Sequence, residues 1–101
     1  MSNLPKFILS FDRDKQCEYI IHTQEPPFIA QVFPENGHVQ PVNMIAKKYP
    51  IGTRTNRING TYYLIPVIKL FYMPKDPNQL PKLMSRMGNW YYSVIKERNQ
   101  K

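Results

Sequence analysis

Four basic residues and one tyrosine form the part of the sequence with the clearest chemical potential. Lys47 and Lys48 precede a segment that carries Arg54 and Arg57, and Tyr62 follows after a predicted turn. Lysine and arginine contact phosphate groups, and an exposed tyrosine ring can stack on a base. Arginine adds bidentate hydrogen bonding and stacking on rings, which lysine lacks. These residue types in this order are typical of a surface that binds DNA or RNA.

A predicted hairpin positions these side chains. Its turn is Asn59-Gly60, a pair suited to a type I′ turn because both central residues need a positive φ. A two-residue loop would place Arg57 opposite Tyr62 and Arg54 opposite Ile65, with the two arginines on opposite faces. The incoming arm is polar on both faces, so we expect an edge strand there.

The outgoing arm of the hairpin continues into a long apolar run, "LIPVIKLFYM". A strand that is apolar on both faces is expected at the centre of a sheet, largely buried. Proline cannot donate to the ladder, so Pro66 should break or bulge this strand. An alternative to base stacking is that Arg57 stacks on Tyr62 as a cross-strand pair, while Tyr63 packs under a helix. The exposure of Tyr62 is what distinguishes the two interpretations.

The C-terminal segment, "KDPNQLPKLMSRMGNWYYSVIKERNQK", has the apolar spacing of an amphipathic helix. Asp76 or Asn78 can cap its start. Its polar face carries Lys82, Arg86 and Lys96, which we interpret as a solvated stripe that joins the nucleic-acid surface only if the hairpin lies beside it.

Three consecutive aromatic residues lie on the same predicted helix. Trp90, Tyr91 and Tyr92 spread over about 200° of the helix, wider than a small core needs. Exposed aromatics of this kind anchor protein interfaces. They indicate a second hypothesis, in which the chain is a protein-interaction module.

Three further segments alternate as strands do. They are Lys6–Asp12, Gln16–Thr23 and Phe28–Phe33, the last ended by Pro34, while the run "VQPVNMIAKKY" fits a strand or a helical turn. We therefore predict an α+β fold, with an antiparallel sheet of four to five strands and one C-terminal amphipathic helix packed on one face. Residues 1–101 are expected to form a single small domain.

Catalysis and metal binding find little support in the sequence. Cys17, His22 and His38 are the only soft metal ligands, and none has the close-pair spacing of a structural zinc site. Cys17 and His22 point to opposite faces of their predicted strand, which also disfavours a nucleophile–base pair. No glycine-rich phosphate loop is present. We predict no catalytic residues, no metal, no cofactor and no enzymatic activity.

Charge is distributed unevenly along the chain. Residues 1–46 hold three basic and five acidic residues, a net charge of −2, whereas residues 47–101 hold eleven basic and two acidic residues, a net charge of +9. The second half should attract a polyanion or an acidic protein surface. No segment is long and apolar enough to span a membrane, the N-terminus does not resemble a signal peptide, and one cysteine permits no intrachain disulfide, so a cytoplasmic location is expected.

Two functional hypotheses follow. The first is a small basic module that contacts the phosphate backbone of nucleic acid through the hairpin. The alternative is a protein-interaction or inhibitory module encoded by a mobile element, either a homodimer or an inhibitor of a nucleic-acid-processing complex, which uses a sheet edge and the helix aromatics.

Overall fold

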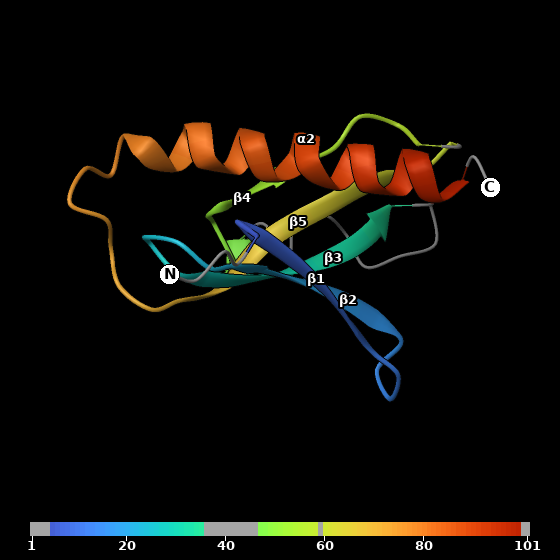
Figure 1. The fold of residues 1–101 in the computed structure, drawn as a ribbon, viewed down its shortest axis with the longest axis horizontal. Coiled ribbons are helices and arrows are strands. Elements are labelled where there is room, and N and C mark those ends of the chain that lie inside the picture. Colours follow the sequence, from blue (N-terminus) through green and yellow to red (C-terminus); the bar gives the residue numbers. More distant parts are fainter. Residues whose placement is uncertain (1–4, 36–46, 59, 100–101) are drawn as a thin grey trace.

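The computed structural model describes residues 5–35, 47–58 and 60–99. Its elements are, in chain order, the strands β1 (Phe7–Asp12), β2 (Cys17–His22), β3 (Phe28–Glu35), β4 (Gly52–Arg54) and β5 (Tyr62–Leu70) and the helix α2 (Gln79–Asn99). The five strands form an antiparallel sheet in the order β1-β2-β3-β5-β4, and α2 lies over one face of it (Figure 1). The predicted α+β fold with a C-terminal helix is therefore confirmed.

Proline does not end the strands where the sequence predicted. β3 continues through Pro34, which pairs with Tyr63 of β5. The last described pair between β3 and β2 is Val32 with Glu18, so β3 has only β5 as its partner at Pro34. The missing N–H is tolerated because one side of the strand is already unpaired there.

β5 likewise runs without a break through Pro66, which pairs with Gly52 of β4. A register shift between β3 and β5 lies beyond the proline, between Ile29 and Ala30 of β3. The predicted irregularity in this strand is therefore present, but not at Pro66 itself. Glycine is required opposite the proline, because a Cβ on Gly52 would lie 2.7 Å from the Pro66 Cα and from the Ile65 carbonyl oxygen.

The hairpin register starts as predicted and then changes by one residue. Ile58 and Thr61 form the expected bridge, but Arg54 pairs with Leu64 rather than with Ile65. The incoming arm thus contains one extra residue between these pairs, which makes a bulge. Thr55 occupies it: its N–H donates to the Tyr63 carbonyl (2.9 Å), and its hydroxyl accepts from the Tyr63 N–H (3.2 Å). Asn59 and the segment 36–46, which includes His38, lie outside the described residues.

The core lies between α2 and the sheet. Phe7 contacts the Trp90 ring at 5.3 Å between centroids, and Tyr63 meets Tyr91 edge-on at 5.4 Å. The helix begins at a cap formed by Asp76, whose carboxylate accepts the Asn78 N–H at 3.0 Å. The other core residues come from both layers: Ile20, Phe28, Ala30, Val32, Ile58, Ile65, Val67, Leu83, Met84, Met87 and Ile95.

α2 approaches the sheet most closely at β4. A Cβ on Gly88 would lie 3.2 Å from the side chain of Thr53. Gly88 thus leaves room for the side chain of Thr53 beside the helix. The contact fixes the hairpin arm beside the helix, which determines the layout of the basic surface.

Candidate nucleic-acid interface

Two arginines of the hairpin contact the same tyrosine ring. The guanidinium carbon of Arg54 lies 4.6 Å from the Tyr62 ring centroid, and that of Arg57 lies 5.1 Å from it. Both arginines are exposed, and Tyr62 is half-buried. The bulge at Thr55 brings the two cations together, so the prediction that they lie on opposite faces is wrong.

The Tyr62 ring is therefore in contact with guanidinium groups, as the cross-strand alternative predicted for Arg57. Each such contact is worth about 0.5–1 kcal/mol at an exposed site. Stacking uses the flat face of a guanidinium, whereas its N–H donors lie in the plane and point away from the ring. The ring thus orders two groups whose donors match the geometry of a phosphate.

A small polar groove runs between the hairpin arm and α2. It encloses about 90 Å³. The residues that line it are Thr53, Arg54, Thr55 and Asn56 on the hairpin side and Ser85, Gly88, Asn89 and Tyr92 on the helix side. The hairpin therefore lies beside the helix. This is the arrangement under which the basic stripe of α2 was predicted to join the nucleic-acid surface.

The basic stripe of α2 is divided between two sites. The Lys96 ammonium lies 5.9 Å from the ring centroid of Tyr92, and Tyr92 is one of the residues that line the groove. Lys82 and Arg86 line a different cavity, together with Lys6 and His22. All three stripe residues are exposed.

Lys47 and Lys48 are exposed and precede β4. The Lys48 ammonium lies 5.4 Å from the ring centroid of Tyr49, its own neighbour in the chain. The two lysines add positive charge before β4, while Arg54 and Arg57 alone share Tyr62.

Tyr91, which the sequence placed in a protein interface together with Trp90 and Tyr92, is a buried core residue. Its side chain is 1 % exposed, and its hydroxyl donates to the Glu18 carboxylate at 2.7 Å. Burial raises the pKa of Tyr91, and the bond to Glu18 raises it further. Trp90 packs on Phe7, and Tyr92 lines the groove, so both are half-buried. The helical spacing of Tyr91 from Met84 and Met87 already marked it as a core position.

The exposed apolar residues lie elsewhere, where the sequence did not place them. Phe71, Tyr72 and Met73 are 54 %, 51 % and 57 % exposed. They end the apolar run that was expected to be buried, but β5 stops at Leu70 because its partner β3 begins opposite, at Phe28. The end of β5 could not be predicted from its own residues, because it depends on where the partner strand β3 begins.

The described residues contain no helix long and apolar enough to cross a membrane, and no three potential metal ligands among them lie close enough to hold an ion. No family model matches the chain, and comparison with curated proteins and with solved structures finds nothing similar. Fold and site together define a small α+β protein with a basic hairpin held against its helix. Its function has to be inferred from its own residues.

Proposed function

We propose that the protein is a non-enzymatic module that binds nucleic acid through its phosphate backbone. The contact surface consists of Arg54 and Arg57 on the hairpin, Lys96 beside Tyr92 on α2, and Lys47 and Lys48 before β4. The observation that carries the proposal is the pair of guanidinium groups ordered on Tyr62 beside a groove of hydrogen-bonding side chains.

Two properties of this surface support a phosphate ligand. Arginines that are already ordered lose less side-chain entropy on binding than free ones, which favours their use as contacts. The groove adds amide and hydroxyl groups from Asn56, Ser85 and Asn89, which are common partners of phosphate and sugar oxygens. Tyr62 acts mainly as the support of the arginines, with base stacking as a secondary role.

Fluorescence anisotropy tests the proposal, with labelled single-stranded DNA, single-stranded RNA and duplex DNA as ligands at low salt. The Arg54→Ala/Arg57→Ala variant should bind about tenfold more weakly, equivalent to about 1.4 kcal/mol. The matched control is Lys15→Ala/Lys69→Ala, which removes the same charge from two exposed positions away from the groove. Absence of binding by the wild type, or an equal loss in the control, would contradict the proposal.

The exposed run Phe71–Met73 supports a second candidate, a protein-interaction module. Its apolar side chains are flanked by Lys69 and Lys75, which fits a partner whose surface is apolar at its centre and acidic around it. A second copy of the chain is the simplest partner to test. Light scattering should then give a dimer that persists at high salt and is lost in Phe71→Ala/Met73→Ala, whereas a monomer at all concentrations would exclude the homodimer.

A further inference from the structure

A second cavity lies between the β2–β3 turn and the first turns of α2. Its volume is about 340 Å³. The residues that line it are Lys6, His22, Gln24, Glu25, Pro26, Gln79, Lys82, Leu83 and Arg86. The volume falls within the range of small-molecule sites in proteins.

The charge of the lining suits a dianion. Lys6, Lys82 and Arg86 supply three positive charges and Glu25 one negative charge, so the lining has a formal net charge of +2 with His22 neutral. A phosphomonoester carries nearly two negative charges at neutral pH. Gln79, the first residue of α2, also lines the cavity, and the N-terminal end of a helix adds favourable partial charge for an anion.

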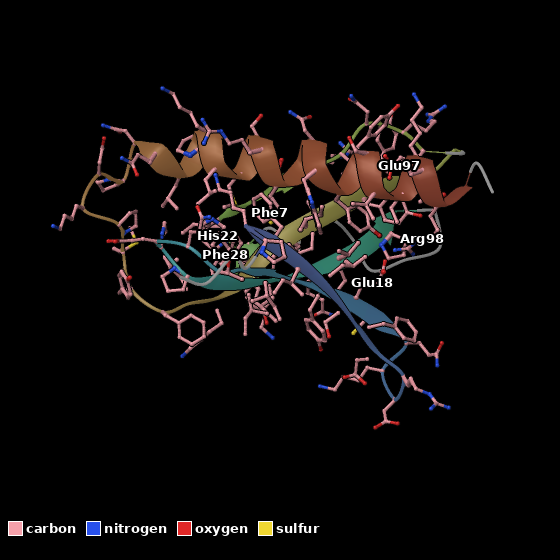
Figure 2. All side chains as sticks on the ribbon, in the orientation of Figure 1. Phe7, Glu18, His22, Phe28, Glu97 and Arg98 are labelled. Carbon is pink, nitrogen blue, oxygen red and sulfur yellow. The ribbon has the colours of Figure 1, made fainter. Side chains whose placement is uncertain are left out.

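His22 supplies an independent observation at the same cavity. It is 1 % exposed, and its Nδ1–H donates to the Pro26 carbonyl at 2.8 Å. Its Nε2 is buried and has no hydrogen-bond partner among the described residues. The ring packs between Phe7 and Phe28, below the N-terminal half of α2 (Figure 2). His22 thus brings a buried acceptor without a partner among the described residues to the lining of the cationic cavity.

We propose that this cavity binds a phosphate group, held by Lys6, Lys82 and Arg86. Arg86 offers paired N–H donors to two phosphate oxygens, and the lysines act as point charges. The group can belong to a free phosphate compound or to the terminal phosphate of a nucleic acid. The site is separate from the hairpin surface, so this proposal does not depend on the proposed function.

NMR of the histidine rings during titration with inorganic phosphate, at constant ionic strength and pH 7, tests the proposal. Direct contact is not needed for a signal, since a bound anion opposes the influence of the Lys6 ammonium on His22. We expect a saturable shift of the His22 signals. The Lys82→Ala/Arg86→Ala variant should weaken it at least tenfold, whereas Lys15→Ala/Lys69→Ala and Arg54→Ala/Arg57→Ala should leave it unchanged.

A second titration distinguishes the two sources of the phosphate. It compares a 5′-phosphorylated hexanucleotide with the same hexanucleotide bearing a 5′-hydroxyl. A lower dissociation constant for the phosphorylated strand than for inorganic phosphate assigns the cavity to the end of a nucleic acid. Equal dissociation constants assign it to a free phosphate compound. A non-saturating shift, an equal shift with chloride, or full retention in Lys82→Ala/Arg86→Ala would overturn the proposal.

Discussion

Glu18 accepts hydrogen bonds from two residues that differ in their environment. The buried Tyr91 hydroxyl donates to one carboxylate oxygen at 2.7 Å, and the half-exposed Arg98 guanidinium approaches the other at 3.4 Å. Glu18 and Arg98 lie together near the C-terminal end of α2 (Figure 2). Water screens the ion pair between Arg98 and Glu18 more than the partly buried hydrogen bond between Tyr91 and Glu18. The hydrogen bond should therefore contribute more to the stability of the fold than the ion pair.

Single substitutions at the two donors test this ranking. Tyr91→Phe should lower the free energy of unfolding by about 1–2 kcal/mol, because it removes a partly buried bond to a charged group. Arg98→Ala should cost no more than about 0.5 kcal/mol, because its ion pair is at the surface. Urea unfolding measures both values, and a larger loss for Arg98→Ala would contradict the ranking.

His22 makes the fold sensitive to mild acid. Burial lowers the pKa of His22 from its ordinary value of 6.5; the bond to the Pro26 carbonyl opposes the shift, and the Lys6 ammonium adds to it. A protonated ring would place a second N–H donor at Nε2, which is buried without a partner among the described residues. The folded protein therefore favours the neutral ring, and Glu25 is the acid nearest to this cavity that could offset the added charge.

The sign of the pH dependence follows from the lowered pKa. Between the folded pKa and 6.5 the unfolded chain binds more protons than the folded one, so stability rises with pH in this window. The contribution is complete above pH 6.5 and is lost as the pH falls. Urea unfolding from pH 7.5 to 5 should show a slope in wild type that is smaller in His22→Gln. Equal slopes in the two proteins would show that His22 is not responsible.

At the scale of elements, the positions of the strands and of the C-terminal helix along the chain could be predicted because their apolar spacing is regular. The register of the hairpin could not, although its turn sequence is the strongest local signal in the chain. The Thr55 hydroxyl accepts the Tyr63 N–H in place of a backbone carbonyl of the ladder. This side-chain bond allows the incoming arm of the hairpin to contain one extra residue. Hydrogen bonds from side chains to the backbone compete with the regular ladder. The apolar spacing of the sequence does not reveal them, so the register could not be predicted from it.

Gly88 and Thr53 form a matched pair between α2 and β4. Gly88→Ala gains about 1 kcal/mol of helix propensity, but its Cβ would press on the Thr53 side chain at 3.2 Å. We expect Gly88→Ala to destabilise the wild type and to stabilise the Thr53→Ala variant, in which the two closest atoms are absent. A double-mutant cycle measured by thermal unfolding gives the coupling, and additive effects would contradict it.

At the scale of the whole molecule, salt should weaken nucleic-acid binding steeply. The logarithm of the binding constant falls linearly with the logarithm of the salt concentration, by about 0.7 for each phosphate contact to a single strand. Removing Arg54 and Arg57 should therefore make the slope shallower by about 1.4. Anisotropy titrations at four salt concentrations measure this change, and an unchanged slope would mean that the two arginines do not contact phosphate.

The candidate site could be predicted only in part, for a reason that belongs to the whole molecule. Composition identifies the cations, and the hairpin indicates that Arg54 and Arg57 are near Tyr62. Which helix cations join them depends on how α2 lies across the sheet, and sequence periodicity does not contain that angle. Lys96 lies beside Tyr92, which lines the groove, whereas Lys82 and Arg86 line the cavity near the β2–β3 turn.

The strand order has a consequence for how the chain assembles. β1, β2 and β3 pair in sequence, β4 and β5 pair with each other, and β3 joins β5 across the segment between them. This junction coincides with the boundary between the acidic and the basic half of the chain. Glu18 in the first half meets Tyr91 and Arg98 in the second. We therefore expect the opposite net charges of the two halves to favour their association during folding, so that added salt should slow folding in stopped-flow measurements.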